Sequence, residues 1–293
     1  MAAIMVATER GLKVAGQSND LLGGADVTAL VNGRAGMWAL VRHQEIFRIA
    51  RGVAEHVATL DGPRAWCLVE YSGVLFIGTD DSGLFKLEGG TLVRVAGFDE
   101  APGRSEWFQP PGRRPATTWA LACGAGQLFV NVHVGGILRS RDGGASFTQT
   151  IDVDLDVHEV QLGSDRRLWA ATGKNGLAES RDAGVNWTFH SAGLPAKYLT
   201  CVAPVEDGVL VAAASGFGSG DDAVYRFDGK KFQRCSYGLP EKLGHLNARQ
   251  LTAQGKRAAV AGGDGCVYAT EDGGLSWQVA LEGLPEVRGV MVT

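Results

Sequence analysis

A recurring pair of short apolar segments constrains the fold of this chain more than any other feature of its sequence. Each pair consists of a run of about five mostly apolar residues, a turn that contains glycine, and a second short run of mostly apolar residues. Clear copies occupy 74–86, 128–140, 168–180 and 258–270. No 3.6-residue period of an amphipathic helix is visible in them, so we predict β-strands.

Three of these copies end in nearly the same octapeptide. It is SRDGGASF at 140–147, SRDAGVNW at 180–187 and TEDGGLSW at 270–277, and a degenerate copy lies at 227–232. Asp142 and Asp182 are 40 positions apart, and Asp272 follows 90 positions later. Four short strands every ~40–45 residues are typical of a β-propeller blade.

We expect the octapeptides to build turns rather than to perform chemistry. An aspartate can accept backbone N–H bonds within its own turn, a glycine supplies the positive φ of a tight hairpin, and the final aromatic ring can pack between sheets. The residues with these structural roles are Ser140, Asp142, Gly144, Phe147, Ser180, Asp182, Gly184, Trp187, Asp272, Gly274 and Trp277.

The octapeptides resemble the Asp-box, also called the bacterial neuraminidase repeat, which is written S-x-D-x-G-x-x-W. This resemblance implies a β-propeller over nearly the whole chain. Proteins with such repeats include sialidases, photosystem assembly factors of plants and cyanobacteria, and sortilin-like receptors. The resemblance therefore implies a fold but not one function.

Counting the repeats predicts an all-β, seven-bladed β-propeller of four-stranded blades in a single domain over 1–293, with six blades as the fallback. Six blades are expected to begin at Val27, Ala65, Thr118, Val157, Tyr198 and Leu246, the first of them ending near Gly52. The seventh blade would combine 287–293 with 4–8 and 11–15, and Leu21-Leu22 could begin its fourth strand. Joining the two ends in one blade pairs edges that would otherwise stay open.

Composition narrows the classes of function. The net charge is −4 and no segment collects Lys and Arg, which argues against nucleic-acid binding. The five cysteines form no CxxC pair, which argues against a disulfide framework or a cysteine zinc site. No apolar run approaches the ~20 residues of a membrane helix, and the first residues do not resemble a signal peptide. We expect a cytoplasmic, monomeric protein.

Polar residues at the starts of inner strands suggest a ligand site at the mouth of the central channel, on the face away from the octapeptides. Asn131 and His133 precede Asp156 and His158 by one blade, and His245, Asn247 and Arg249 repeat the same alternation two blades later. The candidate ligand-binding residues are Asn131, His133, Asp156, His158, Trp119, Tyr198, His245, Asn247, Arg249 and Arg288.

Two further features belong to this face. His133, His158 and His245 could hold a divalent metal such as zinc or copper, although a hydrated polar funnel explains them as well. The cofactor is otherwise unknown. The insertion 99–115 could form a lid or partner surface around Trp107-Phe108, or serve only as a crossover.

Three functions remain open. The preferred one is binding of a small molecule or a protein partner at the channel mouth. A sialidase-like hydrolase is the first alternative. That resemblance implies three arginines, a Tyr–Glu pair and an acidic Asp. The sequence offers only Arg249, Arg288, Tyr198 and Glu159 for these roles, and 47–50 only approximates the expected arginine motif. The second alternative is a metal-dependent enzyme with a histidine-lined site.

Overall fold

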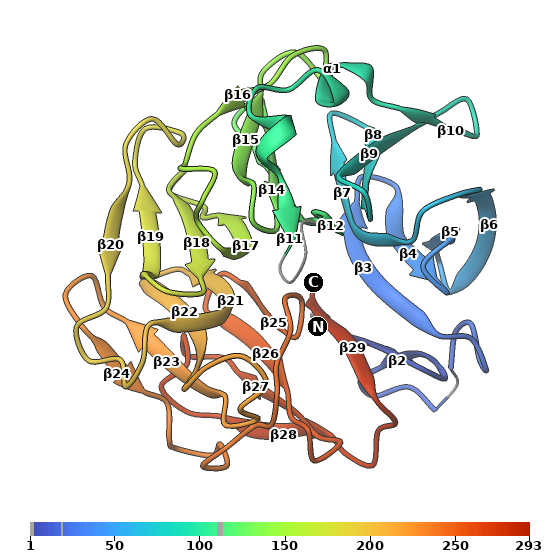
Figure 1. The fold of residues 1–293 in the computed structure, drawn as a ribbon. Coiled ribbons are helices and arrows are strands. Elements are labelled where there is room, and N and C mark those ends of the chain that lie inside the picture. The colour runs from blue at the N-terminus through green and yellow to red at the C-terminus, as the bar shows by residue number, and fades with distance from the viewer. Residues whose placement is uncertain (1–2, 19, 110–113) are drawn as a thin grey trace.

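The computed structural model, which describes residues 3–18, 20–109 and 114–293, shows seven antiparallel sheets arranged in a ring (Figure 1). Neighbouring innermost strands contact one another all the way around the central channel. The predicted seven-bladed propeller is therefore confirmed.

The strands follow in radial order within each blade. The innermost strands are β3 (Val27–Gly33), β7 (Ala65–Tyr71), β13 (Thr118–Gly124), β17 (Val157–Leu162), β21 (Tyr198–Val205), β25 (Leu251–Gln254) and β29 (Val287–Val292). The second strands are β4 (Gly36–Val41), β8 (Val74–Thr79), β14 (Gln127–Val132), β18 (Leu168–Thr172), β22 (Gly208–Ala214), β26 (Arg257–Ala261) and β1 (Ile4–Thr8). The third strands are β5 (Glu45–Ala50), β9 (Gly83–Glu88), β15 (Gly136–Ser140), β19 (Gly176–Ser180), β23 (Ala223–Phe227), β27 (Val267–Thr270) and β2 (Gly11–Val14). The outer strands are β6 (Val53–Thr59), β10 (Thr91–Arg94), β16 (Thr148–Gln149), β20 (Thr188–His190), β24 (Phe232–Arg234) and β28 (Gln278–Leu281).

The two ends of the chain close the ring within one blade. β29 pairs with β1, β1 pairs with β2, and a bridge between Leu12 and Leu21 stands in place of a fourth strand. The sequence predicted this arrangement, because neither end carried enough strands for a blade of its own.

Two blade boundaries differ from the predicted ones. The first blade ends with β6 at Thr59 rather than near Gly52, because 53–59 pairs along the whole of β5 despite its half-polar sequence. The inner strand of the sixth blade begins at Leu251 rather than Leu246, because an irregular segment with a turn at 248–250 precedes it. The expected alternation of His245, Asn247 and Arg249 along a strand was therefore wrong.

The hydrophobic core is divided among the blade interfaces. The described residues form seven buried clusters, and each joins side chains of two neighbouring blades. The cluster between the second and third blades, for example, contains Phe76 of β8 and Val130 of β14. Because each sheet buries both of its faces, its middle strands are almost continuously apolar.

The three octapeptide hairpins, at 140–147, 180–187 and 270–277, hold their own turns. In each of them the aspartate Oδ1 accepts the backbone N–H four residues later, and the initial hydroxyl accepts the backbone N–H of the glycine. We call them the Asp hairpins. They connect third strands to outer strands and so lie on the face opposite the predicted site.

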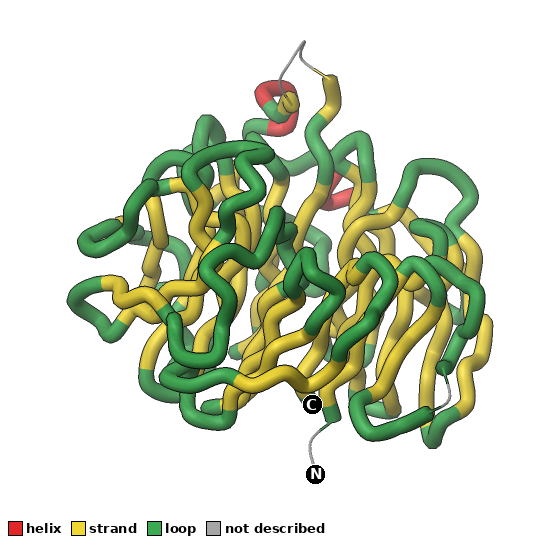
Figure 2. The backbone as a smooth tube through the Cα atoms, turned by 90° about the horizontal axis from the view of Figure 1, so that it is seen from below, coloured by secondary structure: helices red, strands yellow, loops and turns green. Residues whose placement is uncertain are grey.

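The insertion between the second and third blades stands out from the predicted site's face of the disc (Figure 2). The protruding part contains a 3₁₀ turn (Arg104–Glu106) and a short hairpin of β11 (Phe108–Gln109) and β12 (Arg114–Pro115). The preceding α1 (Ala96–Asp99) lies within the disc, where Gly97 is close to the Ala145 carbonyl. Trp107 is 6% exposed and packs into the core against Phe98, so it does not form the expected partner surface. Pro110 and Pro111, also part of the expected lid, lie outside the described residues.

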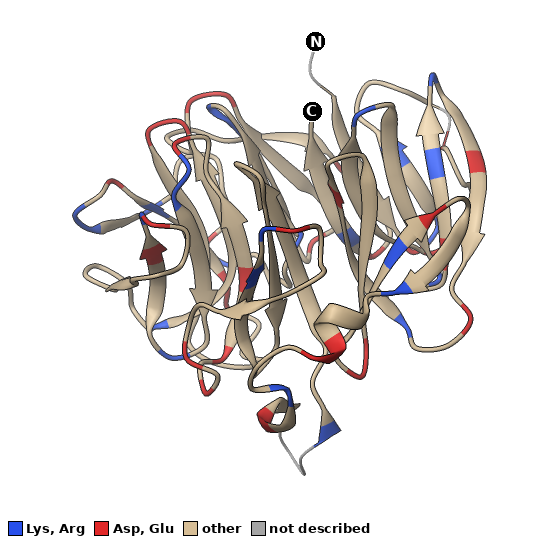
Figure 3. Ribbon diagram, turned by 90° about the horizontal axis from the view of Figure 1, so that it is seen from above, with Lys and Arg blue, Asp and Glu red and all other residues tan. Residues whose placement is uncertain are grey.

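Basic and acidic residues alternate along the blades in the view from above (Figure 3). Within the described ranges, no helix has the length and apolar character needed to cross a bilayer.

Candidate ligand site at the channel mouth

A repeated irregularity of the inner strands builds the mouth. In six blades the ladder to the neighbouring strand skips one residue near the start of the inner strand, which leaves that residue as a β-bulge. The skipped residues are Thr28, Trp66, Trp119, His158, Thr200 and Arg288. A bulge redirects the side chain that carries it. The bulges therefore place the side chains of these six residues at one end of the channel.

Six rings form a continuous arc around this mouth, which we call the ring arc. The successive ring centroids lie 4.5, 5.1, 5.9, 5.7 and 4.9 Å apart through His43, Trp66, Trp119, His133, His158 and Tyr198. These residues come from the first five blades in order. All except His158 are partly exposed.

The centre of the arc holds a compact group of one carboxylate and two imidazoles. Asp156 Oδ1 lies 3.0 Å from His133 Nε2 and 3.3 Å from His158 Nε2. His133 directly follows β14, Asp156 directly precedes β17, and His158 is the bulged residue of β17. Adjacent blades thus supply the three side chains.

The electrostatics of this group are strongly coupled. Burial alone would raise the pKa of Asp156, but the two imidazoles outweigh it and hold the pKa of that carboxyl well below its usual range. Burial alone would lower the pKa of His158, but the Asp156 carboxylate outweighs it and the net pKa of His158 is raised. The charged Asp156 carboxylate is therefore stabilised by a positive charge that lies on one of the two imidazoles or between them.

Neighbouring groups orient both imidazoles. His158 Nδ1 lies 2.6 Å from the Leu199 carbonyl oxygen, and His133 Nδ1 lies 2.7 Å from Gln109 Nε2 of the β11–β12 hairpin. Asn131 is fully buried and donates from Nδ2 to the Val157 carbonyl at 2.9 Å, which joins β14 to β17 directly beside the group. Asn131 thus positions the two blades and is too buried to contact a ligand.

Arg249 crosses the channel beneath the mouth. Its Nη1 donates to the Trp119 carbonyl at 3.3 Å, from the sixth blade to the third, and its guanidinium lies 5.7 Å from the Trp119 ring centroid. On the side of Arg249 that faces away from the mouth, the channel forms a cavity of about 340 Å³. Its lining includes Trp119, Glu159 and Arg249. Arg249 therefore lines the channel, although it is not on a strand.

Glu159 lies deep in the channel wall and is 1% exposed. Its Oε2 accepts from Val202 N at 2.9 Å and its Oε1 from Gln161 Nε2 at 3.1 Å. Burial raises the pKa of Glu159 to about 7, even though these bonds and the charge of Arg249 act against the rise. The Tyr198 ring stacks on His158, and no hydrogen bond joins Tyr198 to Glu159 among the described residues.

The remaining predicted residues lie apart from the centre of the arc. His245 is near the buried Asp222, with 3.7 Å between Nδ1 and Oδ2, and does not belong to the group around Asp156. The exposed Asn247 is bonded through its backbone to Gln250 Oε1 and Cys201 Sγ. Arg288 is neutralised by Asp26 and Glu286 at 3.1 and 2.5 Å.

Four residues of the mouth were not among the candidate ligand-binding residues: His43, Trp66, Gln109 and Asp222. Trp66 had a detectable signal, since it stands second in its inner strand, as Trp119 and His158 do in theirs. Asp222 is fully buried, accepts from Thr200 Oγ1 at 2.6 Å and has its pKa raised by burial. Nothing local in the sequence places Gln109 or Asp222 at the mouth, because each reaches it through a loop.

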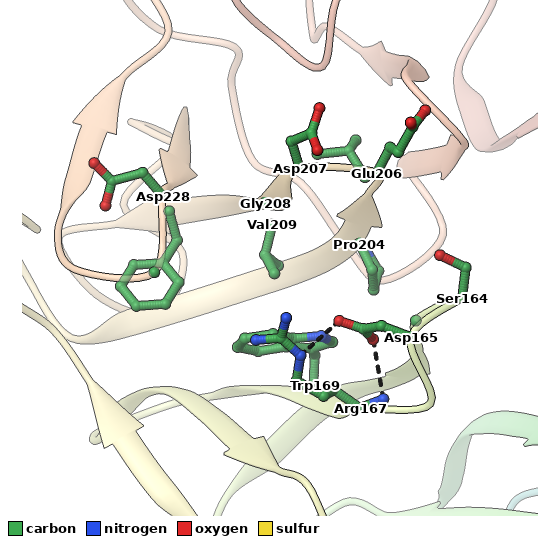
Figure 4. Close-up of a pocket in the computed structure, with 14 residues that line it drawn as sticks. Ser164, Asp165, Arg167, Trp169, Pro204, Glu206, Asp207, Gly208, Val209 and Asp228 are labelled. Atoms are coloured by element: carbon green, nitrogen blue, oxygen red, sulfur yellow. Dashed lines mark hydrogen bonds and ion pairs between the residues drawn. The ribbon is translucent and has the colours of Figure 1, made fainter.

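A second hollow of about 310 Å³ lies between the fourth and fifth blades on the Asp-hairpin face (Figure 4). Arg167 lies over the Trp169 ring there and pairs with Asp165 at 2.5 Å and with Glu179 at 3.1 Å. Its cationic group is thus already neutralised. No residue predicted for ligand binding lines this hollow.

Comparison with known proteins agrees with the fold. No protein-family model and no curated protein matches the sequence. Among solved structures, virginiamycin B lyase from Staphylococcus aureus is 14% identical with a TM-score of 0.62, over 85% of this chain and 82% of that one. YCF48 from Cyanidioschyzon merolae is 12% identical with a TM-score of 0.61, over 92% and 94%. A GH74 enzyme from Niastella koreensis is 16% identical with a TM-score of 0.60, over 88% and 47%.

These similarities define the class: the chain is a β-propeller whose structural neighbours include a lyase, a GH74 enzyme and YCF48, which has also been solved with a D1 peptide. At such low identity they show the shared architecture alone. Membership of the Asp-box family is not shown by them. The function must therefore be argued from the mouth.

Proposed function

We propose that this propeller binds a small molecule with a flat or ring-shaped apolar face at the channel mouth. The observation that carries the proposal is the ring arc, which presents two indoles, a phenol and three imidazoles along one side of a partly open site. Aromatic side chains with a few placed polar groups are typical of small-molecule sites.

The polar groups of the mouth favour a ligand that also carries a hydrogen-bonding edge. Asp156 and the two imidazoles occupy the centre of the arc, and Arg249 with Trp119 forms the floor. A molecule stacked on Trp119 would therefore meet donors and acceptors at its rim. The proposed function is binding at this site; the stacking rings supply contact area and the central polar group supplies orientation.

The first test is a thermal-shift screen of ring-containing small molecules, run with a chelator in the buffer so that metal ions do not contribute. Compounds that raise Tm for the wild type should lose that effect with Trp119→Ala and Tyr198→Ala. Phe189→Ala is the matched control, because Phe189 is an aromatic residue 40% exposed on the outer strand β20.

We expect affinity to fall by about 5–150-fold in the Trp119 variant, which corresponds to the loss of ~1–3 kcal/mol of stacking. Isothermal titration of each hit would measure it. Hits that bind all three variants as tightly as the wild type would contradict the proposal. So would hits that only Phe189→Ala weakens.

A further inference from the structure

The contacts of Asp156 Oδ1 are not those of an ordinary His–Asp ion pair. This oxygen is buried and accepts no hydrogen bond among the described residues, although both imidazole Nε2 atoms lie within 3.3 Å. The nitrogens approach it at the right distance but not with hydrogen-bond geometry. A buried oxygen in this position calls for a hydrogen-bond donor or a cation between itself and the imidazoles.

The proton positions on His158 also indicate that a partner is needed between its Nε2 and Asp156 Oδ1. Its Nδ1 contacts the Leu199 carbonyl, which can only accept, so Nδ1 carries the hydrogen. Nε2 of the neutral ring then directs a lone pair at the Asp156 oxygen. Metal-bound histidines usually donate their other N–H to a carbonyl or carboxylate in this way, which fixes the ring and frees Nε2 for the metal. For His133 the same arrangement requires the Gln109 amide to turn so that Oε1 rather than Nε2 faces Nδ1.

The two donor separations that involve Asp156 suit a single ion. The ligand atoms of His133, Asp156 and His158 all lie within 4.8 Å of one another, and no other such group of three exists among the described residues. Ligands bound about 2.1 Å from a zinc-sized ion lie roughly 3.0–3.4 Å apart. The observed separations of 3.0 and 3.3 Å fall within that range.

We propose that His133, Asp156 and His158 bind a divalent transition-metal ion of the zinc type. The donor set of two imidazoles and one carboxylate suits such ions. The side chains of His133 and Asp156 are 23% and 25% exposed, so the ion would keep an open position facing the mouth. Asp156 takes the place that sequence analysis assigned to His245.

This inference does not depend on the proposed small-molecule binding, because it is tested with metal alone. Protein stripped with chelator is loaded with Zn²⁺, dialysed, and analysed for its metal by mass spectrometry. A parallel sample is titrated with Co²⁺, whose visible absorption reports coordination by imidazole and carboxylate. We expect one ion per chain in both measurements.

Three variants assign the ligands. Asp156→Asn and His133→Ala should weaken Co²⁺ binding by more than the roughly 10–100-fold that changes outside the ligand set cause. His245→Ala is the matched control and should bind like the wild type, because His245 lies at Asp222 instead. Circular dichroism and Tm, both measured in chelator, confirm that each variant is folded. His133→Ala serves if Asp156→Asn does not fold.

Less than about a tenth of an ion per chain would overturn the proposal and leave a protonated imidazole as the cation beside Asp156. Unchanged binding in His133→Ala and Asp156→Asn would also overturn it. Equal losses in those variants and in His245→Ala would point to nonspecific binding by surface histidines, with the same consequence.

Discussion

At the scale of single residues, one carboxylate can organise a whole turn. Asp182 Oδ1 accepts from Asn186 N at 2.8 Å and from Ser180 Oγ at 2.9 Å, and Oδ2 accepts from Asn186 Nδ2 at 2.7 Å. These bonds favour the charged form, so they lower the pKa of Asp182 to about 2, with the Asn186 backbone bond as the largest cause. The charge therefore has a structural role in the turn.

We predict that Asp182→Asn lowers Tm at pH 7, because an amide keeps only one acceptor oxygen. The pKa of Asp182 is lowered in the folded state, so its contribution is complete above the unfolded pKa of ~3.9 and is lost as pH falls towards 2. The difference in Tm between wild type and variant should shrink over that interval in thermal unfolding measured by circular dichroism. A constant difference would contradict this account.

Asp207→Asn is the matched control for that series. The Asp207 carboxylate is 70% exposed and makes one ion pair of 3.7 Å with Lys256, so its removal should leave Tm nearly unchanged at every pH.

At the scale of elements, the Asp hairpins separate two glycine positions that look alike in sequence. Gly274 has φ +91°, and a Cβ added there would lie 2.5 Å from Leu210 Cδ2 of the neighbouring blade. Gly273 has φ +76°, but a Cβ would meet nothing closer than 4.0 Å. The hairpin at 180–187 has Ala183 at the position of Gly273, with φ 59°, so a side chain is tolerated there.

We predict that Gly274→Ala destabilises the fold by about 2–3 kcal/mol, through backbone strain and overpacking together. Gly273→Ala should cost about 1 kcal/mol, since only the strain of positive φ remains. Urea unfolding of the two variants measures both values. Equal destabilisation would show that the contact with Leu210 is relieved at little cost.

At the scale of the whole molecule, the closure of the ring depends on both ends of the chain. Thr293 N donates to the Ala3 carbonyl at 3.1 Å, and Ala3 N donates to Thr293 Oγ1 at 3.2 Å, in line with the β1–β29 ladder. Because β29 is an innermost strand, its loss would expose the apolar faces of the first and sixth blades.

We predict that a circular permutant keeps the fold if its original ends are joined by a short Gly-Ser linker and it is opened between Gly89 and Gly90. That turn is exposed, and the original ends already lie together. Its Tm should stay within a few degrees of the wild type. Truncation after Glu286 should instead remove cooperative unfolding, as followed by calorimetry. A truncated chain as stable as the wild type would contradict the closure argument.

The sequence by itself determined most of the strands, the number of blades, the shared seventh blade and the end of the channel at which His133 and His158 lie. These follow from local spacing, because each blade repeats one short antiparallel unit and its Asp hairpin is built from eight consecutive residues. Where local signals were weak, as in the half-polar β6 and the irregular segment before β25, the boundaries were wrong.

Only the tertiary structure decided which side chains meet. The choice of Asp156 rather than His245 beside the two imidazoles depends on bulges, and a bulge shifts the side-chain alternation by one residue without a reliable sequence signal. Arg249 reaches Trp119 because the channel brings the third and sixth blades together across its axis. Such contacts join residues far apart in sequence, and no local pattern encodes them.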